Sequence, residues 1–104
     1  MHKITDDESL ISLLFARDES ALSRLAEKYH TLLLSITRRI LPDARDVEEC
    51  VNDTYIRIWN AIPPEHPVSL PAYLPRVARN LALERYTYNS AAKRSRAPTD
   101  AFEE

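Results

Sequence analysis

The sequence contains no glycine among its 104 residues, whereas average usage of about 7% would give roughly seven. Glycine is used in tight hairpins, β-bulges and phosphate-binding loops, because it adopts backbone conformations that other residues avoid. Its absence argues against a β-rich fold, a P-loop and a dinucleotide-binding fingerprint. Helices that are joined by proline-marked turns can form without it.

Cysteine and long apolar runs are also scarce. Cys50 is the only cysteine, so no intramolecular disulfide can form, and nothing indicates an oxidising compartment. The N-terminal segment "MHKITDDESL" is polar and lacks the apolar region of a signal peptide. No apolar run approaches the roughly 20 residues that a membrane span needs. These features favour a cytoplasmic protein that does not insert into membranes.

Residues that could carry catalysis or hold a metal are not grouped in the sequence. The three histidines, His2, His30 and His66, lie far apart and have no clustered cysteine or carboxylate partners, which argues against a metal site. The sequence motifs of serine hydrolases and zinc proteases are missing. We therefore predict a protein that is not an enzyme and that uses no cofactor.

Charge is distributed unevenly along the chain, although the formal net charge is only −2. Residues 1–70 carry a net charge of −4, residues 71–96 carry +5, and residues 97–104 carry −3. Such asymmetry indicates two surfaces with two kinds of partner. The basic segment is compatible with nucleic-acid binding, but a solvated helix face would have the same composition.

Four helical stretches can be recognised from the caps, prolines and apolar spacing of the chain. The first, in residues 5–18, opens with the capping-box pattern of Thr5 and Glu8. The second, in residues 18–41, can be capped by Asp18 and ends before a proline. Apolar residues recur in the second stretch at steps of three and four, which is the spacing of one helix face.

The third stretch, in residues 43–62, can be capped by Asp43. Asp46, Glu48 and Glu49 crowd its first turns, and we attribute them to the helix dipole, which favours anions at this end.

Three prolines between residues 63 and 67 then interrupt regular structure. The fourth helix begins near residues 69–72, but Pro75 follows closely. Either the regular helix starts near Pro75 or its first turn is kinked there. The polar, aperiodic residues after about 88 suggest a frayed helix end followed by a linker.

The expected fold is all-α, a compact bundle of about four helices, in which the second and third form the longest pair. The helical stripes predict the following core residues: Leu25, Tyr29, Leu33, Ile36, Val51, Tyr55, Ile58, Val77 and Leu81.

Two surfaces of this bundle are candidates for binding. On the third helix, a tryptophan and an isoleucine lie beside acids and an amide outside the core stripe, which is typical of a contact patch. Trp59 could instead cover the edge of the core. On the fourth helix, Arg76, Arg79 and Arg85 cannot all face the core; guanidinium groups contact phosphates, and Asn80 can read a base edge.

These two helices carry a family resemblance. "CVNDTYIRIW" in the third and "AYLPRVARN" in the fourth resemble the paired motifs of region 2 of bacterial RNA polymerase sigma factors, most closely the extracytoplasmic-function group. The resemblance spans about residues 6–92. It departs from the family pattern at three places: Asn52-Asp53 replaces the common Gln-Glu, Tyr73 replaces a tryptophan, and Pro75 is unusual within that helix.

The resemblance implies a factor for transcription initiation with two binding surfaces. The third helix would dock on the clamp helices of the polymerase β′ subunit, and the matching residues are Glu49, Asn52, Asp53, Ile56 and Trp59. The loop and fourth helix would recognise and melt the promoter −10 element and hold a flipped non-template base. The matching residues there, with the neighbouring basic side chain, are Pro64, His66, Leu70, Tyr73, Arg76, Arg79, Asn80 and Arg85.

The resemblance also bears on organisation and partners. Residues 1–92 would form the region 2 domain, and residues 93–104 would begin the interdomain linker, with the family's region 4 absent from this chain. We therefore expect a domain of a longer protein. Its expected partners are the polymerase core and promoter DNA, with an anti-sigma factor as a further candidate. The alternative function is a helical interaction module that binds polymerase without recognising DNA, as a decoy or scaffold.

Overall fold

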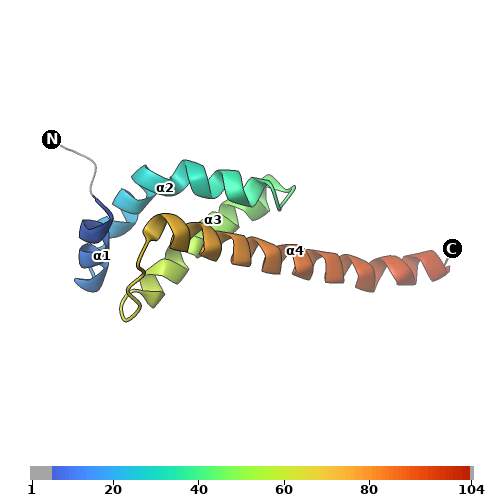
Figure 1. The fold of residues 1–104 in the computed structure, drawn as a ribbon. Coiled ribbons are helices and arrows are strands. Elements are labelled where there is room, and N and C mark those ends of the chain that lie inside the picture. The colour runs from blue at the N-terminus through green and yellow to red at the C-terminus, as the bar shows by residue number, and fades with distance from the viewer. Residues whose placement is uncertain (1–5, 104) are drawn as a thin grey trace.

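The computed structural model describes residues 6–103, and it describes side chains as far as residue 93. This part of the chain contains four helices and no strand, which confirms the all-α prediction (Figure 1). The helices are α1 (Asp7–Phe15), α2 (Ser20–Arg38), α3 (Ala44–Ala61) and α4 (Leu70–Glu103). Among these residues, no helix is long and apolar enough to cross a membrane.

Aspartate side chains accept backbone hydrogen bonds near the starts of α1 and α2. The side chain of Asp6 accepts a hydrogen bond of 2.8 Å from the Ser9 backbone N–H, so Asp6 is the N-cap. The capping-box pattern had predicted Thr5 there, a residue outside the described part of the chain. This prediction was wrong because the helix begins one residue later than the capping-box pattern places it. Asp18 accepts a bond of 2.9 Å from the Ser20 backbone N–H, but it lies one residue before the N-cap of α2, which is Glu19 and makes no side-chain cap bond.

The start of α3 follows the prediction. Asp43 is its N-cap and accepts a hydrogen bond of 2.7 Å from the Arg45 backbone N–H. The helix ends at Ala61, immediately before the proline-rich loop. A carboxylate acceptor at this position satisfies a donor that the first turn leaves open.

The fourth helix begins within the expected range of residues 69–72 and extends further than expected. It starts at Leu70, and the Ser69 carbonyl accepts from the Tyr73 backbone N–H at 2.9 Å. Pro75 therefore lies within α4 and does not mark its start. α4 continues to Glu103 and projects beyond the bundle (Figure 1), where we expected frayed helix and irregular chain. The proposal that residues 93–104 begin a linker stays a prediction.

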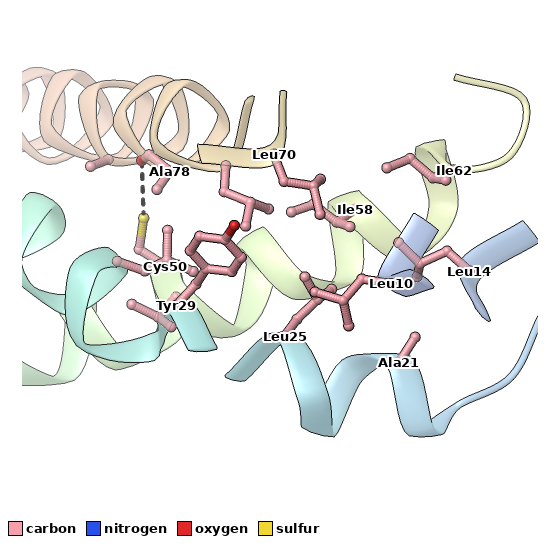
Figure 2. Packing of buried hydrophobic residues seen from close by; sticks show 14 of the residues in the cluster. Leu10, Leu14, Ala21, Leu25, Tyr29, Cys50, Ile58, Ile62, Leu70 and Ala78 are labelled. Atoms are coloured by element: carbon pink, nitrogen blue, oxygen red, sulfur yellow. Dashed lines mark hydrogen bonds between the residues drawn. The ribbon is translucent and has the colours of Figure 1, made fainter. Parts of the chain in front are cut away.

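The core lies where α3 packs against both α2 and α4, with α1 against α2 (Figure 2). Of the nine predicted core residues, five are buried: Leu25, Tyr29, Leu33, Val51 and Ile58. The other four are only partly buried: Ile36, Tyr55, Val77 and Leu81.

The difference is clearest on α4, whose buried stripe is Leu74, Ala78 and Ala82 at steps of four. The two alanines are small, so they let the α4 backbone approach its neighbours closely. Val77 and Leu81 flank this line of contact. The contact is close enough for the Cys50 Sγ on α3 to lie 3.8 Å from the Ala78 carbonyl oxygen, to which it donates (Figure 2).

Candidate protein and nucleic-acid interfaces

The outer face of α3 presents most of the residues predicted to bind polymerase. Asn52, Asp53 and Ile56 are exposed, and 56% of the Ile56 surface is accessible to solvent. These side chains lie off the buried stripe because that stripe runs through Val51, Thr54 and Ile58. An exposed isoleucine beside an acid and an amide is a plausible contact surface for another protein.

Trp59 differs from these three residues. It is partly buried and packs against the core. The guanidinium carbon of Arg17 lies 3.7 Å from the centroid of its ring, which is a stacked cation–π contact. The sequence left open whether Trp59 points outward or covers the core edge, and the structure places it at the core edge with Arg17 over its ring.

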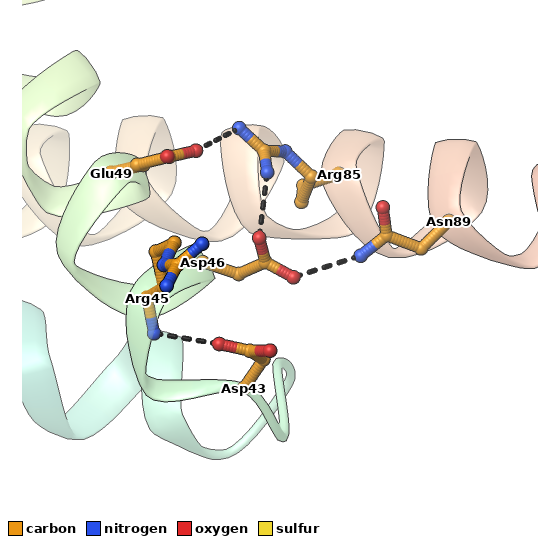
Figure 3. Close-up of polar contacts among 6 residues, drawn as sticks. All are labelled: Asp43, Arg45, Asp46, Glu49, Arg85 and Asn89. Carbon is orange, nitrogen blue, oxygen red and sulfur yellow. Dashed lines mark hydrogen bonds and ion pairs between the residues drawn. The ribbon is translucent and has the colours of Figure 1, made fainter.

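Glu49 takes part in a charged network that joins α3 to α4 (Figure 3). Arg85 Nη1 donates to Asp46 Oδ1 at 2.7 Å, and Arg85 Nη2 donates to Glu49 Oε1 at 2.8 Å. Asn89 donates to the second Asp46 oxygen at 3.0 Å. The hydrogen bond with Glu49 is the main reason that the pKa of Arg85 is raised. Asp46 and Glu49 therefore bind a residue of α4. From the sequence we had attributed both acids to the helix dipole alone, so this contact between helices was not predicted.

The arginines on the exposed face of α4 differ from Arg85 in their contacts. Arg76, Arg79 and Asn80 are exposed. Within the part of the chain whose side chains are described, no hydrogen bond or ion pair engages them. Their positions, three and four residues apart, place them on one side of the helix. Two uncommitted guanidinium groups and one amide can therefore meet an external partner without breaking an internal contact.

The loop between α3 and α4 lies at the start of this basic face. Pro64 and His66 are exposed in it, whereas Leu70 is only 1% exposed and anchors the end of the loop in the core. The Leu70 side chain is therefore a support and does not lie on the surface. The loop is also tied to α4, because the Tyr73 hydroxyl donates to Glu65 Oε1 at 2.9 Å.

Tyr73 is partly buried, which leaves part of its ring for contact with a partner. Burial, and then the bond to Glu65, raise the pKa of its hydroxyl to about 12, so the group stays a neutral donor. Arg57 and Arg76 act in the opposite direction on this pKa. Arg57 is an exposed residue of α3 that sequence reasoning missed, and it adds a third guanidinium near the loop.

A groove of about 540 Å³ lies between α2 and α3 and reaches Asn52. Leu34, Leu41 and Val51 contribute apolar walls, and Arg38 and Glu48 contribute charges of opposite sign. The groove therefore extends the α3 surface toward α2.

Comparison with known families connects these surfaces to a function. The model of the Sigma-70 region 2 family matches residues 25–92, a span that includes most of α2, all of α3, the loop and the first part of α4. No curated protein and no solved structure gave a significant match. Since the family match covers well over half of the chain, the chain belongs to the Sigma-70 region 2 family.

Proposed function

We propose that this chain is the promoter-opening domain of an extracytoplasmic-function sigma factor. The family acts in transcription initiation, with RNA polymerase and promoter DNA as its partners. In the proposal, α3 binds the clamp helices of the β′ subunit, while the α3–α4 loop and α4 bind the non-template strand of the −10 element. The observation that carries the DNA half is the exposed set of Arg76, Arg79 and Asn80, which have no hydrogen-bond or ion-pair partner among the side chains of residues 6–93.

The two arginines are suited to phosphate contacts. Guanidinium groups bind phosphate oxygens strongly, and each contact releases condensed counterions, so that affinity falls as salt rises. Arg76 and Arg79 give up no ion pair with any described side chain when they bind. This distinguishes them from Arg85, which would have to leave Asp46 and Glu49.

Base recognition falls to the loop and the start of α4. An amide such as that of Asn80 can both donate to and accept from a base edge. The Tyr73 ring supplies a surface on which an extruded base can stack, and stacking contributes about 1–3 kcal/mol per base. Pro64 and His66 would line the other side of the bound base.

The polymerase half of the proposal uses the exposed residues of α3. Asn52, Asp53 and Ile56 are exposed together on α3, and the α2–α3 groove adjoins them. Glu49 and Trp59 remain in the predicted set, but both already have internal contacts. We therefore expect Asp53 and Ile56 to contribute more to polymerase affinity than Trp59.

Strand opening in this proposal requires no catalytic group. Extruding a base loses stacking and pairing energy of a few kcal/mol. Phosphate contacts and capture of the base offset that loss, so binding energy alone shifts the duplex toward the open form.

The test uses the complete chain bound to purified bacterial core RNA polymerase and a pool of single-stranded oligonucleotides with randomised sequence. Sequencing of the bound fraction gives the preferred bases, and binding of one selected oligonucleotide is then measured over a range of salt concentrations. Arg76→Ala and Arg79→Ala should each make the salt slope shallower by about 0.7 to 1 unit. Asn80→Ala should instead reduce the preference for one base by about 1–3 kcal/mol and leave the salt slope unchanged.

Arg45→Ala is the matched control, because Arg45 is also exposed but lies at the opposite end of α3 from the loop. It should change neither quantity. If Arg76→Ala and Arg79→Ala leave both affinity and salt slope as they are, the basic face is merely solvated. A polymerase-binding module without DNA recognition would then be the better account.

A further inference from the structure

The turn after α1 contains a residue in an uncommon backbone conformation. Arg17 has a φ of 60°, and it is the one described residue with positive φ. The Asp18 N–H bonds to the Leu13 carbonyl at 2.9 Å, and the Arg17 N–H bonds to the Leu14 carbonyl at 3.0 Å. This pair of bonds is the Schellman motif that ends many helices, and glycine usually occupies the position of Arg17 because a Cβ is unfavourable there. A side chain held at such a position calls for a functional explanation.

The Arg17 side chain reaches the end of α3. Its Nη1 donates to the carbonyl oxygens of Trp59 at 2.8 Å and Ile62 at 3.0 Å. In a continuing helix the Trp59 carbonyl would accept from the backbone N–H of residue 63, but that residue is Pro63, which has none. Arg17 therefore supplies the missing donor, and its charge complements the negative end of the α3 dipole.

These contacts lie at the root of the candidate base-recognition loop. A second contact from the same turn reaches the middle of that loop, where the rings of Phe15 and His66 lie with centroids 5.7 Å apart and planes tilted by 49°. On the α4 side of the loop, the Tyr73 hydroxyl donates a hydrogen bond to Glu65. The loop is thus held by α1 as well as by α4.

We infer that the turn after α1, through Arg17 and Phe15, positions the loop of residues 63–69 for base recognition. The inference rests on the proposed function of that loop and adds to it a part of the chain that lies before the family match, which begins at residue 25. Its physical basis is preorganisation: a loop already fixed in the binding geometry loses less conformational entropy when a base enters.

The experiment compares wild type with Arg17→Gly and Phe15→Ala in the complex with core RNA polymerase and the randomised oligonucleotide pool. Glycine suits the positive φ, so Arg17→Gly removes the guanidinium while leaving the turn itself favourable. Arg17→Gly should lower the enrichment ratio of the preferred base by about tenfold, and Phe15→Ala by a smaller factor. Thermal melting temperature and the helical circular-dichroism signal should change little, which separates positioning from a general loss of stability.

Trp59 provides a direct check on the contact, since it is the only tryptophan. Loss of the Arg17 guanidinium should expose the Trp59 ring, so that acrylamide quenches the Trp59 fluorescence more strongly. Arg76→Ala serves as the comparison variant, because it should reduce affinity for all oligonucleotides without changing the enrichment ratio.

The outcomes separate this inference from the proposed function. If wild type enriches no base, the proposed function fails and the inference fails with it. If wild type enriches a base and a folded Arg17→Gly variant keeps the same ratio, only the inference is overturned. It is also overturned if Arg17→Gly weakens binding to all sequences equally with a shallower salt slope, since Arg17 would then be a phosphate contact. Should Arg17→Gly not fold, an unchanged ratio in Phe15→Ala overturns the inference in the same way.

Discussion

Replacing Arg85 by alanine tests whether this basic residue of α4 contacts DNA or stabilises the fold. The sequence predicts DNA contact for Arg85, whereas in the structure its guanidinium already binds Asp46 and Glu49. The side chains are 30% exposed for Arg85, 21% for Asp46 and 50% for Glu49. Exposed ion pairs contribute about 0.2–1 kcal/mol each, and the less exposed pair with Asp46 should lie near the upper limit. Arg85→Ala should therefore lower the free energy of unfolding by about 1–2 kcal/mol.

The assay is thermal unfolding followed by circular dichroism. For a domain of this size, 1 kcal/mol corresponds to about 4–8 °C in melting temperature, so the effect is easily measured. A double-mutant cycle with Asp46→Ala isolates the coupling between the two side chains. Arg79→Ala is the matched control on the same helix, because Arg79 is exposed and forms no ion pair within the described part of the chain. Its effect should stay within about 0.5 kcal/mol.

Salt provides a second arm of the same experiment. The difference between wild type and Arg85→Ala should shrink as salt rises, because the Debye length falls from about 10 Å at 0.1 M to about 3 Å at 1 M. A structural role for Arg85 is excluded if Arg85→Ala is as stable as Arg79→Ala and also makes the salt slope of oligonucleotide binding shallower by about one unit. Arg85 would then act on DNA, and its internal ion pairs would contribute nothing to stability.

Three further predictions follow from single side chains. The thiol of Cys50 should react slowly with maleimide at pH 8 in the native protein and rapidly after denaturation, because burial, and then the charge of Asp53, raise its pKa to about 11. The pKa of Asp18 is lowered, chiefly by the hydrogen bond from the Ser20 backbone N–H. The stabilisation that the ionised Asp18 carboxylate provides is therefore present above about pH 4 and is lost as the pH falls through the lowered pKa. Asp18→Asn keeps the acceptor for this hydrogen bond but does not titrate, and its melting temperature should fall less between pH 5 and about 2.5 than that of wild type. Asp53→Ala should weaken binding to a β′ clamp-helix fragment without altering the helical signal, and unchanged binding would remove Asp53 from the polymerase surface.

The sequence predicts helices better than it predicts which of their faces are buried. In α2, Leu25, Tyr29 and Leu33 follow one another at steps of four, and all three are buried, because this helix has a single broad apolar face. In α4 the pattern offers both Leu81 and Ala82, and the larger residue looks like the better core residue. The structure buries Ala82, since close approach of two helices favours a small side chain, and that approach depends on the partner helix.

In the candidate site, the exposure of side chains is predictable from the sequence, whereas contacts between helices are not. Exposure of Arg76, Arg79 and Asn80 is predictable from helical spacing, because charged and amide side chains beside an apolar stripe mostly face solvent. The partners of Arg85 are not predictable in this way, since Asp46 and Glu49 lie 39 and 36 residues away in the chain. Their meeting depends on where α3 and α4 cross, which no local pattern encodes.

The lack of glycine and the abundance of proline both bear on the contact between Arg17 and the end of α3. The chain has no glycine and seven prolines, and Pro63 leaves the Trp59 carbonyl without its usual donor. The turn after α1 could have ended in glycine, which would have relieved the backbone but could not have reached α3. Arginine is less favourable at that turn, yet it satisfies two carbonyls of α3 and covers the only tryptophan. The conformational cost in one loop is thus balanced by hydrogen bonds in another, and Arg17→Gly should relieve the first loop while removing its hold on the second.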